Sequence, residues 1–377
     1  MTYTFWVAAV LLLHAWGTYL LVLRLFSFLR DKEVGSDAHT LPVTVLLTVF
    51  NEEKNVRGRI DNILSSNYPK DRLDVLVVSD ASTDATDSIV ESIAAREGRV
   101  RLMRASRGGK SAAQNAAMAS AKGEMVVITD ADTVFERDTI ANLVRPFSDP
   151  SVGCTSGRVV LRGKENSVSE GQGFYWRFEM ALRRLESKVG LLHTASGSVM
   201  AFRKAAFVPF ECQYGDDCII PLDIISQGYK VVHVDDAIAY DSFPSSIEGE
   251  LRARTRMTLR NLTCTLSRMR LLNPFRHPLI SFSMLSHKIL RWLTPFFLIV
   301  LFLSNVFLLP KGVFYQIIFG CQILFYVLAA IGYRGERQGR RIPLCSQAFS
   351  FVLANLGFFW GVCYAIMGKE ITAYRRS

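Results

Sequence analysis

The chain has 377 residues, of which 50% are hydrophobic, and its formal net charge is +10. That length allows one large globular domain with additional segments, or two domains. Its seven cysteines are scattered singly without a C-x-x-C pair, and its six histidines do not cluster near them. The pattern therefore argues against a disulfide framework and against a structural zinc site, and reduced thiols suffice to explain it.

An apolar stretch near the N-terminus, residues 5–23, is long enough to cross a bilayer and is followed by Arg24, Arg30 and Lys32. A secretory signal peptide would carry its positive charge before the apolar stretch and a small-residue cleavage site after it. Neither feature is present in this sequence. We therefore predict that residues 1–30 form an uncleaved membrane anchor.

Three further apolar runs lie near the C-terminus, at residues 293–309, 313–333 and 348–367. Each is close to the ~20 residues that a membrane span needs, and four such runs in one chain argue against buried core helices. The positive-inside rule places the basic flank after the first run, and the arginines 334–341 between the last two, in the cytoplasm. The middle of the chain is then predicted to be cytoplasmic.

Counting crossings on this basis places the C-terminal tail, with Lys369, Arg375 and Arg376, on the opposite side of the membrane. The positive-inside rule disfavours that placement. Two alternatives remain open at this point. Either the last apolar run is re-entrant, or the tail is too weakly charged to obey the rule.

Between about Leu41 and Asp241, strand-like and helix-like segments alternate. Apolar, β-branched runs predict strands, and helical spacing or N-capping residues predict the helices between them. The expected strands are residues 42–50, 73–79, 100–103 and 125–129. The expected helices are residues 51–66, 111–121 and 218–226, together with a helix that Ser82, Thr83 and Asp84 open. This order predicts an α/β fold with a mostly parallel, buried sheet. The expected domains are 1–30 (anchor), 41–248 (catalytic), 249–288 (basic interfacial helices) and 289–377 (membrane domain).

Ligands of parallel α/β sheets bind beyond the carboxyl ends of the strands, so the residues there are the candidates for function. Neither a G-x-G-x-x-G nor a P-loop motif follows any of these strands, which argues against a Rossmann dinucleotide enzyme and a P-loop ATPase. Polar side chains follow three strands. They are Thr48, Asn51 and Glu52 after the first, Asp80 after the second, and Asp130 and Asp132 after the fourth.

Asp130 and Asp132 flank one small residue directly after the apolar strand MVVIT. Two carboxylates in that position can hold a hard divalent cation through oxygen while leaving room for phosphate oxygens. Such a cation would neutralise charge on a departing diphosphate. The alternative is a pair of solvated turn aspartates, because D-x-D by itself is a weak pattern.

Two turns on the same side of the predicted sheet offer further polar groups. Asp80 can accept a hydrogen bond from the edge of a base, whereas Asp84 is interpreted as a helix cap. Gly108-Gly109-Lys110 opens a helix, where backbone N–H groups and a lysine suit an anionic ligand. A plain basic turn before an Ala-rich helix is the alternative for that segment.

Asp216 and Asp217 follow Tyr214-Gly215 and precede the helical run 218–226. One carboxylate can act as a general base on a hydroxyl, and the other can tune it, since close carboxylates rarely keep ordinary pKa values. The alternative is an acidic helix N-terminus, which the helix dipole favours in any case.

Six arginines lie between residues 250 and 270. They indicate an interfacial helix on anionic lipid, a clamp for pyrophosphate, or both. We expect most of them to face the lipid surface and one or two to reach the site. Membrane lipids, and no nucleic acid, are the expected partners of this basic segment.

Several of these motifs occur in the order known for one family: T-V-F-N-E-E, V-S-D-A-S-T-D, G-G-K-S-A-A-Q-N-A-A, T-D-A-D, G-D-D and a final R-x-R. The chain resembles family 2 glycosyltransferases with the GT-A fold. Within that family it looks like the membrane-integrated branch that makes bacterial exopolysaccharides, including poly-N-acetylglucosamine, cellulose and hyaluronan synthases. The resemblance covers roughly residues 41–300 and implies an inner-membrane location.

The resemblance implies a role for each matching position. Thr48, Asn51 and Glu52 would line the nucleoside pocket, with Asp80 on the base and Lys110 near the donor. Asp130 and Asp132 would bind donor phosphates and Mg²⁺ or Mn²⁺. Asp217 would be the catalytic base, and Arg256 would meet the departing diphosphate.

The acceptor side is also implied by the resemblance. Ser196-Gly197-Ser198 resembles the small-residue segment beneath the acceptor, with Asp216 near it. The run GFYWRFEMALRRLES resembles a helix beside the acceptor channel, so Trp176, Glu179 and Arg183 become acceptor-side candidates. Amphipathic packing is the alternative for most residues of that run.

One departure bears on the product. Processive members of the branch carry Q-x-x-R-W, where this chain has Ala253-Arg254-Thr255-Arg256-Met257. The arginine is kept, but the glutamine and the tryptophan that would lie under the acceptor sugar are absent. Addition of one sugar to a lipid-linked acceptor therefore fits at least as well as polymerisation.

The expected reaction is a single displacement at the anomeric carbon of a nucleoside diphosphate sugar, which inverts its configuration. Unlike a glycosidase, it needs no carboxylic acid for the leaving group. Two alternatives stay open: a processive synthase with partner-assisted export, and a non-catalytic scaffold among other polysaccharide assembly proteins. A transporter or receptor would leave the strand-end aspartates unexplained, and charges inside the predicted spans are nearly absent.

Overall fold

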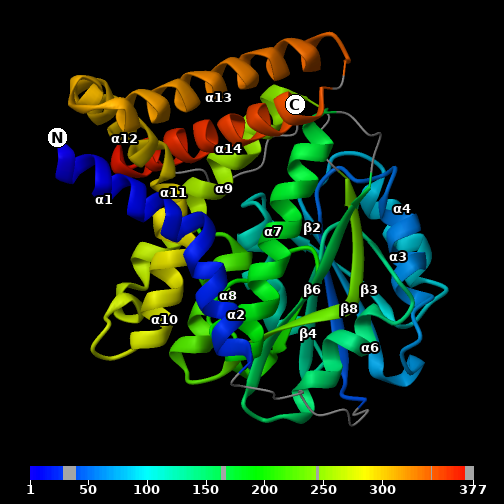
Figure 1. Cartoon of the computed structure of the whole chain (residues 1–377). Helices are drawn as coiled ribbons and strands as arrows, with labels where there is room; N and C mark the ends of the chain where they lie inside the picture. Colours follow the sequence, from blue (N-terminus) through cyan, green and yellow to red (C-terminus); the bar gives the residue numbers. More distant parts are fainter. Residues whose placement is uncertain (29–39, 163–166, 243–245, 341, 370–377) are drawn as a thin grey trace.

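The computed structural model describes residues 1–28, 40–162, 167–242, 246–340 and 342–369. The basic residues Arg30, Lys32, Arg341, Arg375 and Arg376, used above to orient the chain, lie outside these ranges. An α/β domain occupies one end of the molecule, and the apolar helices of both termini gather at the other (Figure 1). The α/β fold with apolar helices at both ends is thereby confirmed.

Within the described ranges, eight strands form one sheet in the order β3-β2-β1-β4-β7-β6-β8-β5. Their bounds are β1 (Val43–Val49), β2 (Leu73–Asp80), β3 (Val100–Ala105), β4 (Met125–Thr129), β5 (Val134–Phe135), β6 (Val152–Arg162), β7 (Met200–Arg203) and β8 (Lys230–Ser242). Neighbouring strands among β3, β2, β1 and β4 pair in parallel, and β6 also pairs in parallel with β8. Strand β7 is antiparallel to both β4 and β6, and β5 is antiparallel to β8. The four expected strands are confirmed as β1 to β4.

The central parallel strands β1 and β4 are mostly apolar because both of their faces are covered. Val45 and Leu47 of β1 belong to one core, which includes Ile60 of α3. Leu46, which points to the opposite face, belongs to a second core that includes Ala113 of α5. The helices of this domain are α3 (Val56–Leu64), α4 (Thr86–Ala94), α5 (Lys110–Ala117), α6 (Thr139–Val144), α7 (Ser167–Val189) and α8 (Asp216–Ser226).

The turns after β1 and β2 approach each other closely. Asn51 and Ala81 both have positive φ, 53° and 58°. The side-chain oxygen of Asn51 accepts a hydrogen bond of 2.8 Å from the backbone N–H of Thr83. Helix α4 begins at Thr86, later than the expected start at Ser82, because Asp84 Oδ1 accepts a 3.0 Å bond from the Thr86 N–H ahead of the first turn.

In the part of the chain that the structure describes, four helical segments are long and apolar enough to cross a membrane: Thr2–Phe28, Thr294–Lys311, Val313–Arg337 and Pro343–Ile366. They contain α1 (Thr2–Leu13), the π-helix η1 (His14–Thr18), α2 (Tyr19–Phe28), α12 (Thr294–Leu308), α13 (Val313–Arg337) and α14 (Pro343–Ile366). Between the domain and these helices lie α9 (Ile247–Ser267), α10 (Pro278–Ser283), the π-helix η7 (Met284–Ile289) and α11 (Leu290–Trp292). The short 3₁₀ segments are η2 (Lys70–Arg72), η3 (Met118–Ser120), η4 (Arg145–Ser148), η5 (Lys204–Ala206), η6 (Met269–Leu272) and η8 (Leu309–Lys311).

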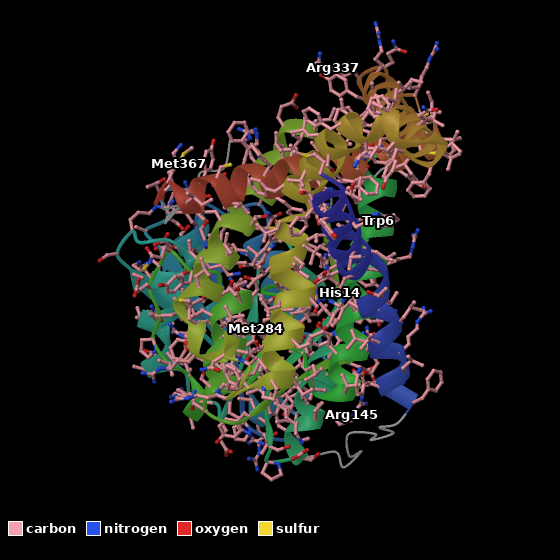
Figure 2. The ribbon with its side chains drawn as sticks, turned by 60° about the vertical axis from the view of Figure 1, so that its left-hand side comes forward. Trp6, His14, Arg145, Met284, Arg337 and Met367 are labelled. Atoms are coloured by element: carbon pink, nitrogen blue, oxygen red, sulfur yellow. The ribbon has the colours of Figure 1, made fainter. Side chains whose placement is uncertain are left out.

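The N-terminal helix lies against η7, which follows the α/β domain in the chain. His14 Nε2 is 2.9 Å from Ser286 Oγ, and Figure 2 shows His14 and Met284 on neighbouring helices. Tyr19 and Leu23 pack against Leu182 of α7 in a separate apolar cluster. The expected anchor therefore also supports the longest helix of the domain.

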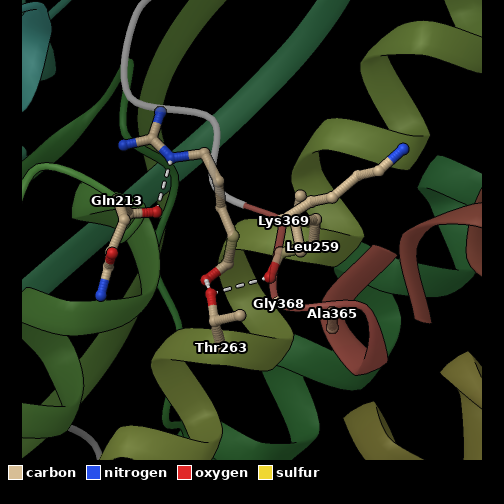
Figure 3. Close-up of a pocket in the computed structure, with 7 residues that line it drawn as sticks. Gln213, Leu259, Thr263, Ala365, Gly368 and Lys369 are labelled. Carbon is tan, nitrogen blue, oxygen red and sulfur yellow. Dashed lines mark hydrogen bonds between the residues drawn. The ribbon is translucent and has the colours of Figure 1, made fainter. Parts of the chain in front are cut away.

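Helix α14 runs along α9 in the same direction. Phe349 and Leu353 pack against the start of α9, and further along a Cβ on Gly361 would lie 2.5 Å from the Cβ of Thr258. The end of α14 lines a pocket together with Gln213 of the α/β domain. That end of α14 therefore lies at the domain (Figure 3), and both alternatives for the last run stay predictions.

Candidate active site

Polar residues from three adjacent strands meet at one edge of the sheet. Strands β2, β1 and β4 are parallel neighbours, so Asp80, Thr48 and Asp130 emerge at their common carboxyl end. A one-residue register shift would have turned these side chains to the other face. The strand-end residues selected from the sequence are therefore brought together.

Lys110 joins two of the predicted groups. Its Nζ lies 2.7 Å from Asp130 Oδ1 and 3.0 Å from Asp216 Oδ2. Lys110 is the first residue of α5 and follows Gly109, whose φ of 84° suits glycine. Burial alone would lower the pKa of the Lys110 ammonium, but Asp130 and Asp216 raise it. The ammonium is therefore a permanent positive charge between the carboxylates of Asp130 and Asp216.

A third carboxylate belongs to this cluster and was missed from the sequence. Asp241 lies near the end of β8, and β8 pairs with β5, which begins two residues after Asp132. Burial, together with Asp132 and Asp130, raises the pKa of Asp241 to about 6. Partial burial and the carboxylates of Asp216 and Asp132 likewise raise the pKa of Asp130, although Lys110 opposes them.

Burial is the largest cause of these raised pKa values, and repulsion between the aspartates adds to it. Carboxylate oxygens are the ligands that hard divalent cations prefer. A cation held by Asp130 and Asp132, with Asp241 beside them, would relieve the repulsion that raises the pKa of Asp241. The donor set therefore fits a site for Mg²⁺ or Mn²⁺.

Asp216 and Asp217 are the first two residues of α8 and have different surroundings. Asp216 accepts a hydrogen bond of 2.8 Å from Gln114 Nε2 and forms an ion pair with Lys110. Burial alone would raise the pKa of Asp216, but these two contacts lower it. Burial and the Asp216 charge raise the pKa of Asp217. Asn261 Nδ2 lies 3.5 Å from Asp217 Oδ2. The pKa values of the two neighbouring aspartates are thus shifted in opposite directions.

Gly197 lies where a side chain would meet Asp216. A Cβ at this position would be 3.0 Å from Asp216 Oδ1. The Gly197 carbonyl is also 3.4 Å from Lys110 Nζ. The small-residue segment predicted beneath the acceptor therefore lies directly beside the paired aspartates.

Arg260 of α9 connects both sides of the site. Its Nη2 donates to Ser111 Oγ at 3.0 Å, and its Nε donates to the Gln213 carbonyl at 3.3 Å. It also donates to the carbonyl of Tyr214, just before Asp216. Arg256 lies one turn earlier on α9 and is half-buried.

Most of the six arginines were expected to face lipid and one or two to reach the site, and three of them contact protein groups. Arg254 pairs with Glu250, Arg268 pairs with Asp223, and Arg260 holds the loop before Asp216. These contacts arise because α9 packs against α14 on one side and lies beside the loop before Asp216 on another, and the contact of the remaining arginines with lipid stays a prediction.

On the nucleoside side, Thr48 Oγ1 is buried without a hydrogen-bond partner in the described part of the chain. Glu52 accepts a hydrogen bond of 2.8 Å from Asn55 Nδ2. Asn51 accepts a hydrogen bond from the backbone N–H of Thr83 in the turn after β2. The Asp80 carboxylate accepts from the backbone N–H groups of Gly108 and Gly109. Asp80 thereby positions the glycine turn before Lys110, and its predicted contact with a base stays a prediction.

The acceptor-side candidates on α7 are engaged within the protein. Trp176 Nε1 donates to the Val159 carbonyl at 2.7 Å. Glu179 pairs with Arg183 at 3.0 Å, and Arg183 also donates to Ser196 Oγ at 2.8 Å. These contacts agree with the packing alternative for the run, and an acceptor contact stays a prediction.

Glu179 belongs to a buried polar network that the sequence did not reveal. His287 Nε2 lies 3.0 Å from Glu179, and His287 Nδ1 lies 2.9 Å from Glu186. Tyr19 of α2 donates to Glu186 at 2.7 Å. Glu186, His193 and His287 approach closely enough to suggest a metal site, but both nitrogens of His287 already contact carboxylates. The network instead joins α7 to η7 and α2.

Other supporting residues also lacked a sequence signal. The Arg59 side chain donates to Thr129 Oγ1 at 2.6 Å and to the Asp130 carbonyl at 3.2 Å. Gln114 and Asn261 contact the paired aspartates as described above. Each of these residues comes from a helix distant in sequence from its partner, so local patterns could not identify it.

Residues 44–208 match the family model described as glycosyl transferase family 2. Over 222 residues the chain is 25% identical to a poly-beta-1,6-N-acetyl-D-glucosamine synthase of Staphylococcus aureus, covering 57% of this chain and 53% of that protein. It is 26% identical over 231 residues to an N-acetylglucosaminyltransferase of Bradyrhizobium diazoefficiens, covering 57% and 47%. The chain thus spans about half the length of the curated relatives it matches.

Among solved structures, the mannosyltransferase PcManGT of Pyrobaculum calidifontis, in complex with GDP-Man and Mn²⁺, is similar with a TM-score of 0.73. The alignment covers 97% of this chain and 100% of that one at 24% identity. At this identity the similarity establishes the fold. It extends over the α/β domain and the apolar helices together.

Proposed function

We propose that this chain, whose residues 44–208 match the family model of glycosyl transferase family 2, is a membrane-embedded, inverting glycosyltransferase. It moves a sugar from a nucleoside diphosphate donor to a lipid-linked or glycan acceptor at the cytoplasmic face of the inner membrane. The product belongs to a cell-surface polysaccharide or a glycolipid.

The contact of Lys110 with Asp130 and Asp216 carries this proposal. Asp130 follows the central strand of the donor half, and Asp216 precedes the proposed base. One ammonium therefore fixes the distance between the two halves of the site. Such positioning is worth several kcal/mol in a reaction between two bound molecules.

The two aspartates of α8 divide the acid–base work. Asp216 stays ionised because Lys110 and Gln114 stabilise its charge. Asp217 has a raised pKa and no such pair of stabilising contacts, which suits a group that must accept a proton. Asp217 takes the proton of the acceptor hydroxyl as its oxygen bonds to the anomeric carbon. The bond from that carbon to the diphosphate oxygen breaks, and the configuration inverts.

The leaving diphosphate needs positive charge. Arg256 would supply it from α9, and Arg260 holds α9 against the start of α5. Asp130 and Asp132 would hold Mg²⁺ or Mn²⁺, which when bound neutralises charge on the diphosphate. The complex of PcManGT with GDP-Man and Mn²⁺ supports divalent metal dependence.

The names of the two curated relatives support an N-acetylhexosamine donor, so UDP-N-acetylglucosamine is the first donor to test. The processive alternative rests on the S. aureus relative, whose product is a polymer by name. Met257, half exposed where processive members carry tryptophan, favours single addition. Export of a polymer would require other assembly proteins.

The test is release of nucleoside diphosphate from a panel of UDP- and GDP-sugars. The purified full chain is used in lipid, with membrane extract as acceptor, with and without Mn²⁺. We expect metal-dependent release from one donor. Asp235→Asn, which removes the surface partner of Arg184, serves as the control and keeps full activity. Absence of release from every donor, with nucleotide still bound, would contradict the proposal and favour the scaffold alternative.

A further inference from the structure

Helix α3 carries a buried cation that the proposed mechanism does not use. Arg59 is only 3% exposed. Its neighbours Val56, Ile60 and Ile63 belong to the core between α3 and the sheet, and α3 lies beside α4 in Figure 1. An arginine is almost never fully buried unless its N–H groups are engaged. The partners of those N–H groups therefore identify its role.

The Arg59 guanidinium reaches the end of β4 and the residues that follow it. Nη2 donates to Thr129 Oγ1 at 2.6 Å, and Nε donates to the Asp130 carbonyl at 3.2 Å. Thr129 ends β4, and residues 130–134, called the metal turn here, contain the candidate ligands Asp130 and Asp132. The planar guanidinium has its donors in a fixed geometry, so it fixes two consecutive residues at once.

The far end of the metal turn is held from the same helix. Asn62 follows Arg59 by three residues and therefore lies on the same face of α3. Its Nδ2 donates to the Phe135 carbonyl at 2.9 Å, and its Oδ1 accepts from the Phe135 N–H at 2.9 Å. Arg59 also donates to Asn62 Oδ1, and its guanidinium carbon lies 4.1 Å from the centroid of the Phe135 ring. One turn of α3 thus clamps both ends of the metal turn.

The charge of Arg59 acts on the same carboxylates. Burial lowers the pKa of the Arg59 guanidinium to about 9, and Asp130 and Asp132 oppose that shift. The guanidinium therefore stays charged at neutral pH. A buried positive charge that interacts with two like-charged carboxylates offsets part of their repulsion before a cation binds.

The contacts of Arg59 continue to the acceptor side of the proposed site. Thr129 Oγ1 accepts from Arg59 and donates to the Ser198 carbonyl at 2.9 Å. Ser198 directly follows Gly197, whose carbonyl lies 3.4 Å from Lys110 Nζ. One hydroxyl group therefore connects the metal turn to the small-residue segment beside the paired aspartates.

We propose that Arg59 is a positioning residue for the metal turn. Its contacts hold Asp130 and Asp132 in the geometry that a divalent cation requires, and through Thr129 they keep the turn in place against the acceptor-side segment. This role rests on the proposed function, in which a bound cation neutralises charge on the departing diphosphate. A lysine at position 59 keeps the charge but has a single ammonium, which cannot reproduce the fixed set of donors.

Metal binding is measured without turnover. The purified full chain in detergent is titrated with MnCl₂, and free Mn²⁺ is followed by its electron paramagnetic resonance signal. We expect Arg59→Lys to weaken Mn²⁺ binding about tenfold, the lower end of the roughly 10–100-fold effect of residues that orient metal ligands. Thr129→Val, which keeps the shape of the side chain but removes the hydroxyl, should also weaken it. Thr129→Ser keeps the hydroxyl and should restore native binding.

The matched control is Arg57→Lys, because Arg57 lies on the same helix but is exposed and donates to Ser92 Oγ at 3.4 Å. It should leave Mn²⁺ binding unchanged. Thermal unfolding without metal shows which variants are folded. Unchanged Mn²⁺ affinity in folded Arg59→Lys would overturn the proposal. If Arg59→Lys does not fold, unchanged affinity in Thr129→Val would overturn it, as would absence of Mn²⁺ binding by the native chain.

Kinetics test the connection to the acceptor side. Thr129→Val also removes the hydrogen bond to the Ser198 carbonyl, so at saturating Mn²⁺ it should raise the KM for acceptor about fivefold, the typical effect of one hydrogen bond. An unchanged acceptor KM would overturn this part of the proposal. Failure of the proposed function would appear differently, as absence of nucleoside diphosphate release from a native chain whose Mn²⁺ binding still depends on Arg59.

Discussion

Replacing Glu179 by glutamine tests whether the acceptor-side candidates on α7 are structural. The Glu179 carboxylate is 4% exposed and lies 2.7 Å from Arg291, 3.0 Å from Arg183 and His287, and 3.3 Å from Lys288. Removing one partner of a buried ion pair costs about 3–5 kcal/mol. Arg183 keeps Ser196 and His287 keeps Glu186, so the lower end of that range, about 3 kcal/mol, is expected here.

The assay is thermal unfolding of the full chain in detergent. At roughly 2–4 °C per kcal/mol, Glu179→Gln should lower the apparent Tm by about 6–12 °C. Asp71→Asn is the control, because Asp71 is 80% exposed and pairs with Arg72 at 3.6 Å. Its effect should stay within about 0.5 kcal/mol. A Tm within 2 °C of the native value for Glu179→Gln, combined with a raised KM for acceptor, would refute the structural interpretation.

The pH dependence of this stabilisation follows from the pKa of Glu179. Burial alone would raise that pKa, but Lys288, His287 and the arginines lower it well below its usual value. A depressed carboxyl pKa stabilises the fold above the unfolded value of about 4.3, and that stabilisation is lost as the pH falls toward the folded pKa. The Tm difference between the native chain and Glu179→Gln should therefore be constant at neutral pH and shrink only in acid.

Three further predictions concern the site and the helix packing. The charge of Asp216 raises the pKa of Asp217, so Asp216→Asn should move the acidic limb of the pH–rate profile of sugar transfer to lower pH. An unmoved limb would show that the acidic limb reports the protonation of a group other than Asp217. Asp132→Ala should raise the Mn²⁺ concentration for half-maximal nucleoside diphosphate release about tenfold or more, since it removes a charged ligand, and an unchanged titration would place the metal elsewhere. Gly361→Leu should destabilise the chain by about 1–3 kcal/mol, because a Cβ at this position would lie 2.5 Å from Thr258. Gly320→Leu is the control and should not destabilise the chain, because no atom lies within 4 Å of the added Cβ. Thermal unfolding of both variants checks this prediction.

The strands that were predicted from sequence are those in which local pattern and tertiary position agree. Residues 43–49 are apolar or β-branched throughout because both faces of β1 are buried, and this run can be recognised without knowledge of its partner strands. Strand β8 was missed because its residues 230–242 mix charged and apolar side chains, and its pairing with β6 and β5 decides its conformation. Asp241 was missed with it.

The same distinction applies to the site. Asp130, Asp132, Asp216 and Asp217 could be selected because the two members of each pair lie within two residues of each other, at one end of a regular element. The contacts that orient them join distant positions: Arg260 and Ser111 are 149 residues apart, and Gln114 and Asp216 are 102 apart. No local pattern encodes such pairs, so Arg260, Gln114 and Asn261 emerge only from the fold. The buried network around His287 has the same origin.

The most direct measurement of the central claim is transfer of radiolabelled sugar from its nucleotide donor into the lipid or polymer fraction, comparing the native chain with Asp217→Asn and Asp235→Asn. The account predicts transfer by the native chain and by Asp235→Asn, and a loss of about 10²-fold or more for Asp217→Asn, because general base catalysis typically contributes roughly 10²–10⁴-fold. Transfer by Asp217→Asn at the native rate would contradict the assignment of Asp217 as the base and, with it, the proposed mechanism.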